Sequence, residues 1–344
     1  MTLAKTNLLN LLPNELEEWM RTHKLEPYRA RQIFLWAYKK NTFDFDQMTD
    51  LPFSLRKELK NYFYFYLPKV IDQKSATDGA QKFLLELEDK KCIEAVFIPE
   101  STPKENSLCL SCQVGCKLGC SFCATGAFGF QRNLSAGEII GQYLVAQSAL
   151  TRKNKIDRLV FMGMGEPLDN WQELKKALSI FTSRKELGFS PRRITVSTAG
   201  IIPLIPELWA TGVNVALSIN APDNKKRTEL MPINQKYPLG QLVKTIRELD
   251  IPFRQKLTCE YVLIKGVNDS LEDADKLAWL LAKIPLRVNL IAFNHFPGSE
   301  FLSPEPNQVL AFQEKLRGAG LMAFIRKSVG KEILAGCGQL AGRR

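Results

Sequence analysis

Three cysteines within eight residues place the strongest constraint on this chain. Cys116, Cys120 and Cys123 follow an apolar segment and have the spacing C-x3-C-x2-C. A cubane iron–sulfur cluster has four irons and is normally held by four thiolates, whereas this spacing supplies three. The fourth iron is then open to another ligand. An open iron that can pass one electron to a bound sulfonium is what radical chemistry on S-adenosylmethionine requires.

A zinc site is the alternative interpretation of these cysteines. Cys109 and Cys112 lie directly upstream with C-x2-C spacing, so a four-thiolate site could be drawn from the five. Zinc sites, however, usually pair two C-x2-C knuckles across a longer insert. The spacing therefore favours one [4Fe-4S] cluster per chain, held by Cys116, Cys120 and Cys123.

Composition limits the class of protein. The chain has 344 residues, of which 45% are hydrophobic, enough for one large domain and a small one. It has no run of 18 apolar residues and no signal-peptide core at its start, so we expect a cytoplasmic protein without a membrane span. Eight cysteines in a reducing compartment indicate metal binding or catalysis. The net charge of +11 suits a polyanionic partner, with basic clusters at 152–153, 192–193 and 225–227.

The first third of the chain contains two different patterns. Residues 1–66 carry helix-period apolar positions and many aromatics, which predicts a small helical domain. Its aromatics either pack a core or dock RNA, and the sequence leaves both open. Residues 81–98 have strand patterns on both sides of a polar turn and predict a β-hairpin.

Strand and helix patterns alternate from residue 107 onward. Six βα units followed by a last strand near 323–326 predict an α/β fold with a parallel sheet, closed into a partial (βα)6 barrel. The expected units are a helical domain at 1–66, a β-hairpin linker at 67–101, the barrel at 102–333 and a C-terminal loop at 334–344.

Glu94 is out of place in the predicted hairpin. With a period of two it shares a face with Cys92, Val96 and Ile98, which is otherwise apolar. A carboxylate there would be partly desolvated, which raises its pKa toward that of a useful base. The alternative is that this face is solvated at the edge of the hairpin.

Polar residues and glycines follow the predicted strands. In a parallel barrel the site forms at the carboxyl ends of the strands, and a glycine there lets the backbone approach a ligand. We expect these residues to bind the amino, carboxylate, ribose and adenine groups of S-adenosylmethionine. They are Gly165, Glu166, Ser197, Ser218, Ile219, Asn220 and Asn294.

Cys337 lies in a loop of small residues after the last predicted strand. A single cysteine in a loop is often incidental. A cysteine flanked by glycines could also swing toward the mouth of a barrel, and the sequence leaves both interpretations open.

Taken together, these residues resemble the RlmN/Cfr family of radical-SAM RNA methyltransferases. The resemblance covers nearly the whole chain, and its most specific parts are the lead-in 113–116 and the tail 337–340. Cys112 stands where many members have serine, and Asn220 where some have histidine. The matching stretches are 94–99, 109–134, 163–168, 193–200, 288–298 and 337–342.

The resemblance implies a route through two further cysteines. Cys337 takes a methyl group from one S-adenosylmethionine, and a 5′-deoxyadenosyl radical made from a second removes a hydrogen from that methyl. The carbon then adds to an adenine, which must be unstacked from its RNA. Glu94 matches the base that removes the ring proton. Cys109 attacks Cys337, leaving a transient disulfide that needs an external reductant.

The resemblance also implies substrates. It indicates methylation of C2 of an adenosine in the peptidyl-transferase centre of 23S rRNA and of an adenosine in the tRNA anticodon loop, with an external electron donor for the cluster. Methylation of C8 of the same rRNA adenosine is the alternative within the family. A glycyl-radical activase would not need Cys109 and Cys337, and a zinc-stabilised RNA-binding protein would use the upstream cysteines for zinc.

Overall fold

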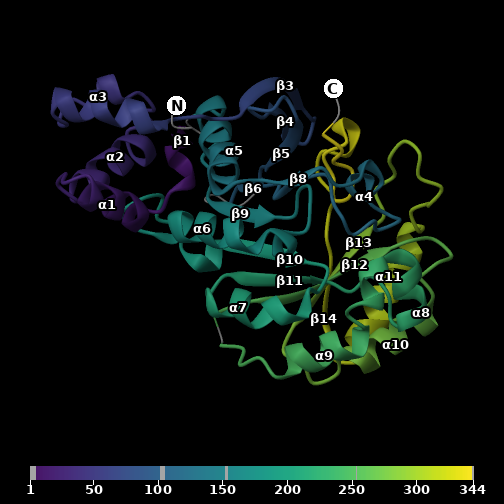
Figure 1. Ribbon diagram of the computed structural model, residues 1–344. Coiled ribbons are helices and arrows are strands. Elements are labelled where there is room, and N and C mark those ends of the chain that lie inside the picture. Colours follow the sequence, from purple (N-terminus) through teal and green to yellow (C-terminus); the bar gives the residue numbers. More distant parts are fainter. Residues whose placement is uncertain (1–4, 101–104, 152–153, 253, 343–344) are drawn as a thin grey trace.

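A central sheet organises the structure, a computed structural model that describes residues 5–100, 105–151, 154–252 and 254–342 (Figure 1). Within these residues the sheet has ten strands in the order β14-β13-β12-β11-β10-β9-β6-β5-β4-β3. Neighbouring strands from β6 to β14 are parallel. The parallel strands are β6 (Ser107–Cys109), β9 (Arg158–Phe161), β10 (Ile194–Thr198), β11 (Asn214–Ser218), β12 (Leu257–Leu263), β13 (Arg287–Ala292) and β14 (Met322–Ile325).

Helices connect these strands, as a series of βα units requires. The predicted partial (βα)6 barrel is therefore confirmed. Capping boxes start two of the helices: Ser135 with Glu138 at α5, and Ser270 with Asp273 at α10. The helices are α5 (Ala136–Ala149), α6 (Trp171–Thr182), α7 (Ile205–Ala210), α8 (Asn224–Leu230), α9 (Leu239–Arg247), α10 (Leu271–Leu281) and α11 (Pro306–Gly318).

The N-terminal helices lie at one end of the molecule (Figure 1). They are α1 (Pro13–Thr22), α2 (Arg29–Tyr38) and α3 (Phe53–Tyr62). The sequence predicted a helical domain that extends to residue 66, but its last helix, α3, ends at Tyr62. Residues Phe63–Tyr64 instead form β2, which pairs in parallel with β1 (Thr6–Asn7). Consecutive aromatics favour an extended chain, which explains the early end of the helix.

The predicted hairpin extends the barrel sheet. It consists of β4 (Gln81–Glu86) and β5 (Cys92–Ile98), and a strand that the sequence did not reveal, β3 (Lys69–Ser75), pairs with β4. Because β5 also pairs with β6, Glu94 is not at a sheet edge, and the alternative of a solvated face is wrong. Glu94 is only 4% exposed.

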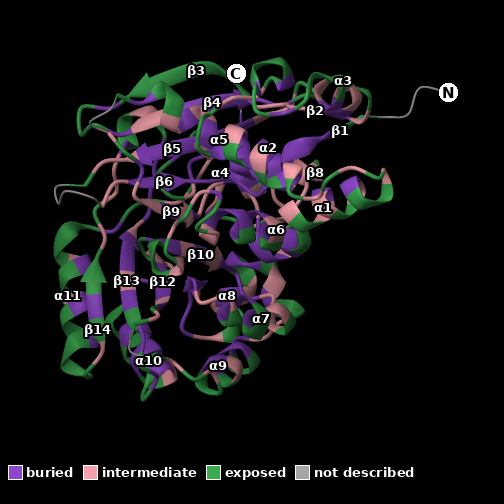
Figure 2. Cartoon of the chain, turned by 90° about the vertical axis from the view of Figure 1, so that its left-hand side faces the viewer, coloured by how far each residue is buried: buried purple, intermediate pink, exposed green. Residues whose placement is uncertain are grey.

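Burial divides the sheet into an interior and edges (Figure 2). The inner strands are largely buried, whereas β3 is exposed along its whole length. One large apolar core runs from the N-terminal helices through the barrel. A second, smaller cluster packs Leu118 and Phe122 of the cysteine loop against Leu230 and Met231, the region where α8 ends. This second cluster holds the cysteine loop on the barrel.

A fully buried cation ties strand ends together beneath that loop. The guanidinium of Arg227, in α8, donates to the carbonyl oxygens of Ala199 (2.7 Å), Ser218 (3.2 Å) and Ile219 (3.2 Å) and to Oδ1 of Asn234 (2.9 Å). Burial lowers its pKa to about 10, so it remains charged at neutral pH. Arg227 therefore fixes the carboxyl ends of β10 and β11 relative to each other.

Replacing this cation should destabilise the fold. Arg227→Met leaves several buried carbonyl groups without a donor, so we expect the free energy of unfolding to fall by about 2–4 kcal/mol. Denaturant titration of the protein measures the change. Arg184→Met, at an exposed arginine, is the control and should change the value by less than about 0.5 kcal/mol. Equal stability of both variants would refute the structural role of Arg227.

Candidate active site

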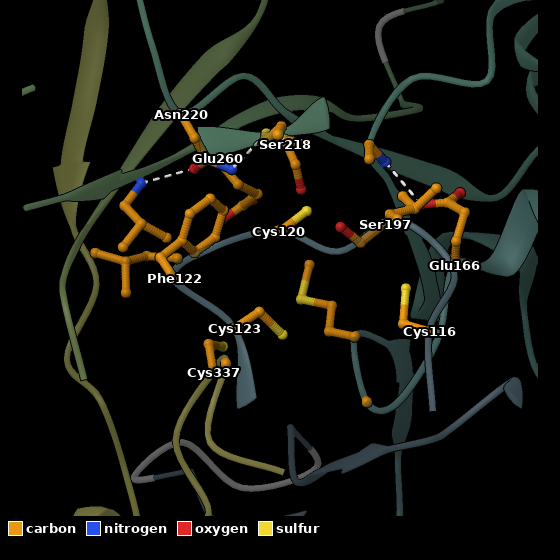
Figure 3. Close-up of a pocket in the computed structure, with 18 of the residues that line it drawn as sticks. Cys116, Cys120, Phe122, Cys123, Glu166, Ser197, Ser218, Asn220, Glu260 and Cys337 are labelled. Carbon is orange, nitrogen blue, oxygen red and sulfur yellow. Dashed lines mark hydrogen bonds between the residues drawn. The ribbon is translucent and has the colours of Figure 1, made fainter. Parts of the chain in front are cut away.

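Cys116, Cys120 and Cys123 line a cavity at the carboxyl ends of the parallel strands (Figure 3). Including its open mouth, the cavity has a volume of about 940 Å³. The loop that carries the cysteines is fixed by its backbone. The amide of Cys116 donates to the carbonyl of Gly129 (3.2 Å), and Ser121 donates to Leu230 (3.1 Å). The short helix α4 (Ala124–Phe128) begins directly after Cys123.

Gly115 shows why this loop needs glycine before its first cysteine. Its φ of +76° lies in the left-handed region, and a Cβ there would lie 1.6 Å from the carbonyl oxygen of Gly129. Any other residue would push the two loop segments apart.

The three thiols fit a cluster better than a single ion. Within the described parts of the chain, no three Cys, His, Asp or Glu side chains are close enough to bind one metal ion. A zinc ion holds all its thiolates about 2.3 Å from one point, whereas each thiolate of a cubane binds a different iron and sits farther from the others. Cys109 and Cys112 instead pack in the main core. The donor set lining the cavity is therefore the three-thiolate set that a cluster with one open iron requires.

Glu166 connects the loop after β9 to the end of β10. Its carboxylate accepts hydrogen bonds from Oγ1 of Thr198 (2.6 Å) and from the amides of Ala199 (2.8 Å) and Leu168 (3.1 Å). Burial raises its pKa to about 7, although these hydrogen bonds favour the ionised form. Gly165 beside it has a φ of +95°, and a Cβ would lie 2.5 Å from Cβ of Gln113. Both residues of this predicted pair line the cavity.

The remaining predicted cofactor residues divide into two groups. Ser197, Ser218, Asn220 and Asn294 line the cavity, and Oδ1 of Asn294 is buried without a hydrogen-bond partner. Ile219 does not line the cavity: its side chain lies in the core, its amide donates to the carbonyl of Glu260 (3.1 Å) and its carbonyl accepts from Arg227 (3.2 Å).

Asn220 has a structural task that the sequence did not reveal. Its φ is +55°, and its Oδ1 accepts a hydrogen bond from the amide of Val262 (2.9 Å), which joins the ends of β11 and β12. The side-chain amide is therefore already engaged.

The C-terminal tail brings Cys337 to the cavity beside Cys123 (Figure 3). The carbonyl of Gly338 accepts from the amide of Ala124 (2.8 Å), the residue that follows Cys123. Nδ2 of Asn294 donates to the carbonyl of Cys337 (3.2 Å). Cys337 as a whole residue is exposed. Of the two interpretations of this cysteine, the structure supports a thiol placed at the mouth of the barrel.

Glu94 and Lys82 hold the two ends of this tail. One carboxylate oxygen of Glu94 accepts from the amides of Ala341 (2.7 Å) and Gly342 (3.0 Å), and the other is 2.8 Å from Nζ of Lys82. The same ammonium donates to the carbonyl of Leu334 (3.2 Å). Glu94 is therefore a buried, ion-paired anchor of the loop that carries Cys337.

Cys109, the last residue of β6, lies in the core. Both thiols are free, and they are close enough to interact electrostatically. Burial raises the pKa of Cys109 to about 12, and the nearby guanidinium of Arg326 acts in the opposite direction. A buried thiol of this kind reacts only after a neighbouring base or cation favours its thiolate.

Three charged residues of the site were missed by sequence reasoning. Lys82, Glu260 and Arg326 each stand within or next to a strand pattern. Glu260 could have been found from the sequence, because it is a charged residue inside the otherwise largely apolar strand 257–263. Lys82 and Arg326 look like ordinary surface cations in the sequence, and only the tertiary structure shows their partners.

The basic clusters are only partly surface features. Residues 152–153 lie outside the described residues. In 225–227, Arg227 is buried and Lys226 is ion-paired with Asp273 at 2.6 Å. No described helix is both long enough and apolar enough to cross a membrane.

Two family models match the chain. Residues 6–64 match the ribosomal RNA large subunit methyltransferase N-terminal domain, and residues 110–278 match the radical SAM superfamily. Radical SAM enzymes use a [4Fe-4S] cluster and S-adenosylmethionine, which are the cofactors predicted from the cysteine spacing.

Curated relatives and a solved structure match over almost the full length. The chain is 43% identical to a dual-specificity RNA methyltransferase RlmN of Syntrophus aciditrophicus, covering 100% of this chain and 98% of that protein. It is also 43% identical to the RlmN of Syntrophobacter fumaroxidans, covering 95% of each. A crystal structure of a radical SAM methyltransferase from Sphaerobacter thermophilus superimposes with a TM-score of 0.91 at 38% identity, covering 98% of this chain and 100% of that chain. The family predicted from the sequence is confirmed: the chain belongs to the RlmN family of radical SAM RNA methyltransferases.

Proposed function

We propose that this enzyme methylates C2 of an adenosine in 23S rRNA and of an adenosine in the tRNA anticodon loop. The relatives named dual-specificity RNA methyltransferases support the two kinds of RNA. The main support for this chemistry is the position of the C-terminal tail. The tail holds Cys337 beside Cys123 and close enough to Cys109 for the two thiols to interact electrostatically. Mass spectrometry of nucleosides from treated RNA tests the assignment, because 2-methyladenosine and 8-methyladenosine give different fragments and retention times. Finding only 8-methyladenosine would establish the alternative regiochemistry.

The roles of the cavity residues follow from their positions. Cys116, Cys120 and Cys123 hold the cluster. S-adenosylmethionine would bind at the open iron of this cluster. The residues proposed to bind it are Glu166, Asn294, Gly165, Ser197, Ser218 and the backbone of Ile219 and Asn220. When bound, cluster and cofactor together supply a radical that removes a hydrogen atom from a methyl group. An external electron donor reduces the cluster.

Cys337 and Cys109 perform the group transfer. The Cys337 thiolate would first attack the methyl carbon of one S-adenosylmethionine, and the bond from that carbon to the sulfonium breaks as S-adenosylhomocysteine leaves. After hydrogen removal, the carbon on Cys337 would bond to C2 of the adenine, and the one unpaired electron left on the adduct would return to the oxidised cluster. Glu94 accepts the C2 proton. Sγ of Cys109 then attacks Sγ of Cys337, the carbon–sulfur bond breaks, and the released carbon takes a proton from solvent to complete the methyl group. The disulfide that remains is reopened by an external thiol reductant.

The outer parts of the chain are proposed to dock the RNA. Residues 1–66 form the docking domain and 67–101 the hairpin linker, followed by the barrel at 102–333 and the tail at 334–344. Phe53 and Tyr28 are 71% and 50% exposed, with Arg56 and Arg29 over their rings. Exposed rings beside cations suit stacking on unpaired bases. An rRNA substrate places the enzyme in the cytoplasm, with the ribosomes.

The cluster assignment predicts iron content. Alanine at Cys116, Cys120 or Cys123 should remove most of the iron, because a cluster left with two thiolates is poorly held. Iron and sulfide analysis after anaerobic reconstitution measures this. Cys112→Ala is the matched control, since Cys112 packs in the core, and it should retain wild-type iron. Loss of iron in the Cys112 variant alone would show that the wrong thiolates were chosen.

The two-cysteine route predicts that variants of Cys337 and Cys109 stop the reaction at different stages. Cys337→Ala should bind cluster and S-adenosylmethionine but transfer no carbon to RNA. Cys109→Ala should accumulate protein joined to RNA through one carbon on Cys337, because no sulfur can release it. A denaturing gel with labelled RNA, followed by mass spectrometry of the Cys337 peptide, measures both. Free methylated RNA at normal rates from Cys109→Ala contradicts the route.

The role of Glu94 can be separated from its hold on the tail. Glu94→Gln should stall with the covalent protein–RNA adduct, because the C2 proton must leave before the carbon–sulfur bond breaks. Lys82→Met loosens the same anchor but keeps the carboxylate, so it should slow methylation about 3–10-fold and still release free RNA. The labelled-RNA gel distinguishes them. Identical behaviour of both variants would reduce Glu94 to an anchor.

A further inference from the structure

Glu260 has a buried carboxylate oxygen without a hydrogen-bond partner. On β12, its Oε1 accepts from Oγ1 of Thr258 (3.0 Å) and Nδ2 of Asn289 (2.8 Å). Its Oε2 has no partner, although the side chain is only 7% exposed. Glu260 also lines the cavity that holds the three cysteines. A buried acceptor left unpaired is costly, so this oxygen is prepared for a donor that the described residues do not supply within hydrogen-bond distance.

Arg326, at the end of β14, faces the same oxygen. Its Nη1 lies 3.9 Å from Oε2 of Glu260, too far for a hydrogen bond, and 3.6 Å from Sδ of Met162. Arg326 lines a second cavity on the other side of the tail. Ile291 and Cys337 line both cavities. The pair therefore stands where the two cavities meet, next to the thiol that carries the methyl group in the proposed function.

An acceptor and a donor side by side match one edge of adenine. The exocyclic amino group of adenine donates, and the ring nitrogen beside it accepts. Guanine and hypoxanthine carry a carbonyl oxygen at the position of that amino group, and the Glu260 carboxylate would repel it. A carboxylate oxygen beside a guanidinium is thus selective for adenine over the other purines.

We propose that Glu260 and Arg326 recognise the acceptor adenine of the RNA: Oε2 of Glu260 accepts from the exocyclic amino group, and Arg326 donates to the adjacent ring nitrogen. This inference rests on the proposed function and specifies how the same site selects its base. The competing occupant of Oε2 is a hydroxyl of S-adenosylmethionine. The serines and Asn294 that line the first cavity already offer polar groups for that ligand. Glu260 differs from them because its Oε2 lies 3.9 Å from Arg326, a cation that lines the second cavity.

The test compares two RNA stem–loops that differ in one group. One has adenosine at the target position, and the other has purine riboside, which lacks the exocyclic amino group. The reconstituted wild-type enzyme should methylate the adenosine RNA at least 10-fold more efficiently in kcat/KM and bind it more tightly. In Glu260→Gln, which keeps the Oε1 contacts, this ratio should fall to near 1. Arg326→Met should lower kcat/KM for both RNAs equally, because both contain the ring nitrogen.

Other outcomes would contradict either the recognition of adenine by Glu260 or the proposed function itself. A wild-type ratio that survives in Glu260→Gln, together with a tenfold higher KM for S-adenosylmethionine, would assign Oε2 to the cofactor and refute the proposal. Glu314→Gln, at an exposed glutamate, is the matched control and should retain the wild-type ratio. If the wild-type enzyme methylated neither RNA, the proposed function would fail. The ratio of the two binding affinities, measured by fluorescence anisotropy, would then still decide whether Glu260 recognises the amino group.

Discussion

The position of the C-terminal tail over the cavity depends on the hydrogen bonds that two backbone amides donate to one carboxylate oxygen of Glu94. They fix Ala341 and Gly342, while Lys82 fixes Leu334 at the other end of the same loop. Hydrogen bonds to a buried charge contribute about 1.5–3 kcal/mol each, more than neutral ones. Between these two ends, Asn294 donates to the carbonyl of Cys337 and Ala124, at the start of α4, donates to the carbonyl of Gly338, which holds Cys337 beside Cys123.

The opposite wall of the cavity is ordered in the same way. Glu166 accepts hydrogen bonds from one amide and one hydroxyl at the end of β10, and Arg227 donates to carbonyl groups at the ends of β10 and β11. A carboxylate thus satisfies donors and a guanidinium satisfies acceptors that the strand ends leave open. Because these groups are paired within the protein, the rim has its shape before a ligand arrives. Such preorganisation lowers the cost of orienting reactants.

The sequence predicted features that depend on local pattern. Alternating strands and helices gave the barrel, and cysteine spacing gave the cluster loop. β3 was missed because its exposed, polar residues lack the alternation of a half-buried strand. The side chain of Ile219 could not be excluded from the cavity, because position at a strand end does not determine which way a residue points. The backbone amides that donate to Glu94 lie almost 250 residues away along the chain, at 341–342, so no local pattern contains them.

The two tasks proposed for Glu94 are physically linked. As an anion it attracts the Lys82 ammonium and the amides of the tail. When it accepts the proton from C2, its charge is neutralised, and the charge-assisted part of each of these bonds is lost. The tail is therefore held least firmly at the stage when Cys109 must reach Cys337. In the proposed function, this loosening gives Cys337 more freedom to approach Cys109, which is buried in the core. Before that step, the same charge holds the tail that carries Cys337 at the cavity, where Cys337 would receive the methyl group in the proposed function.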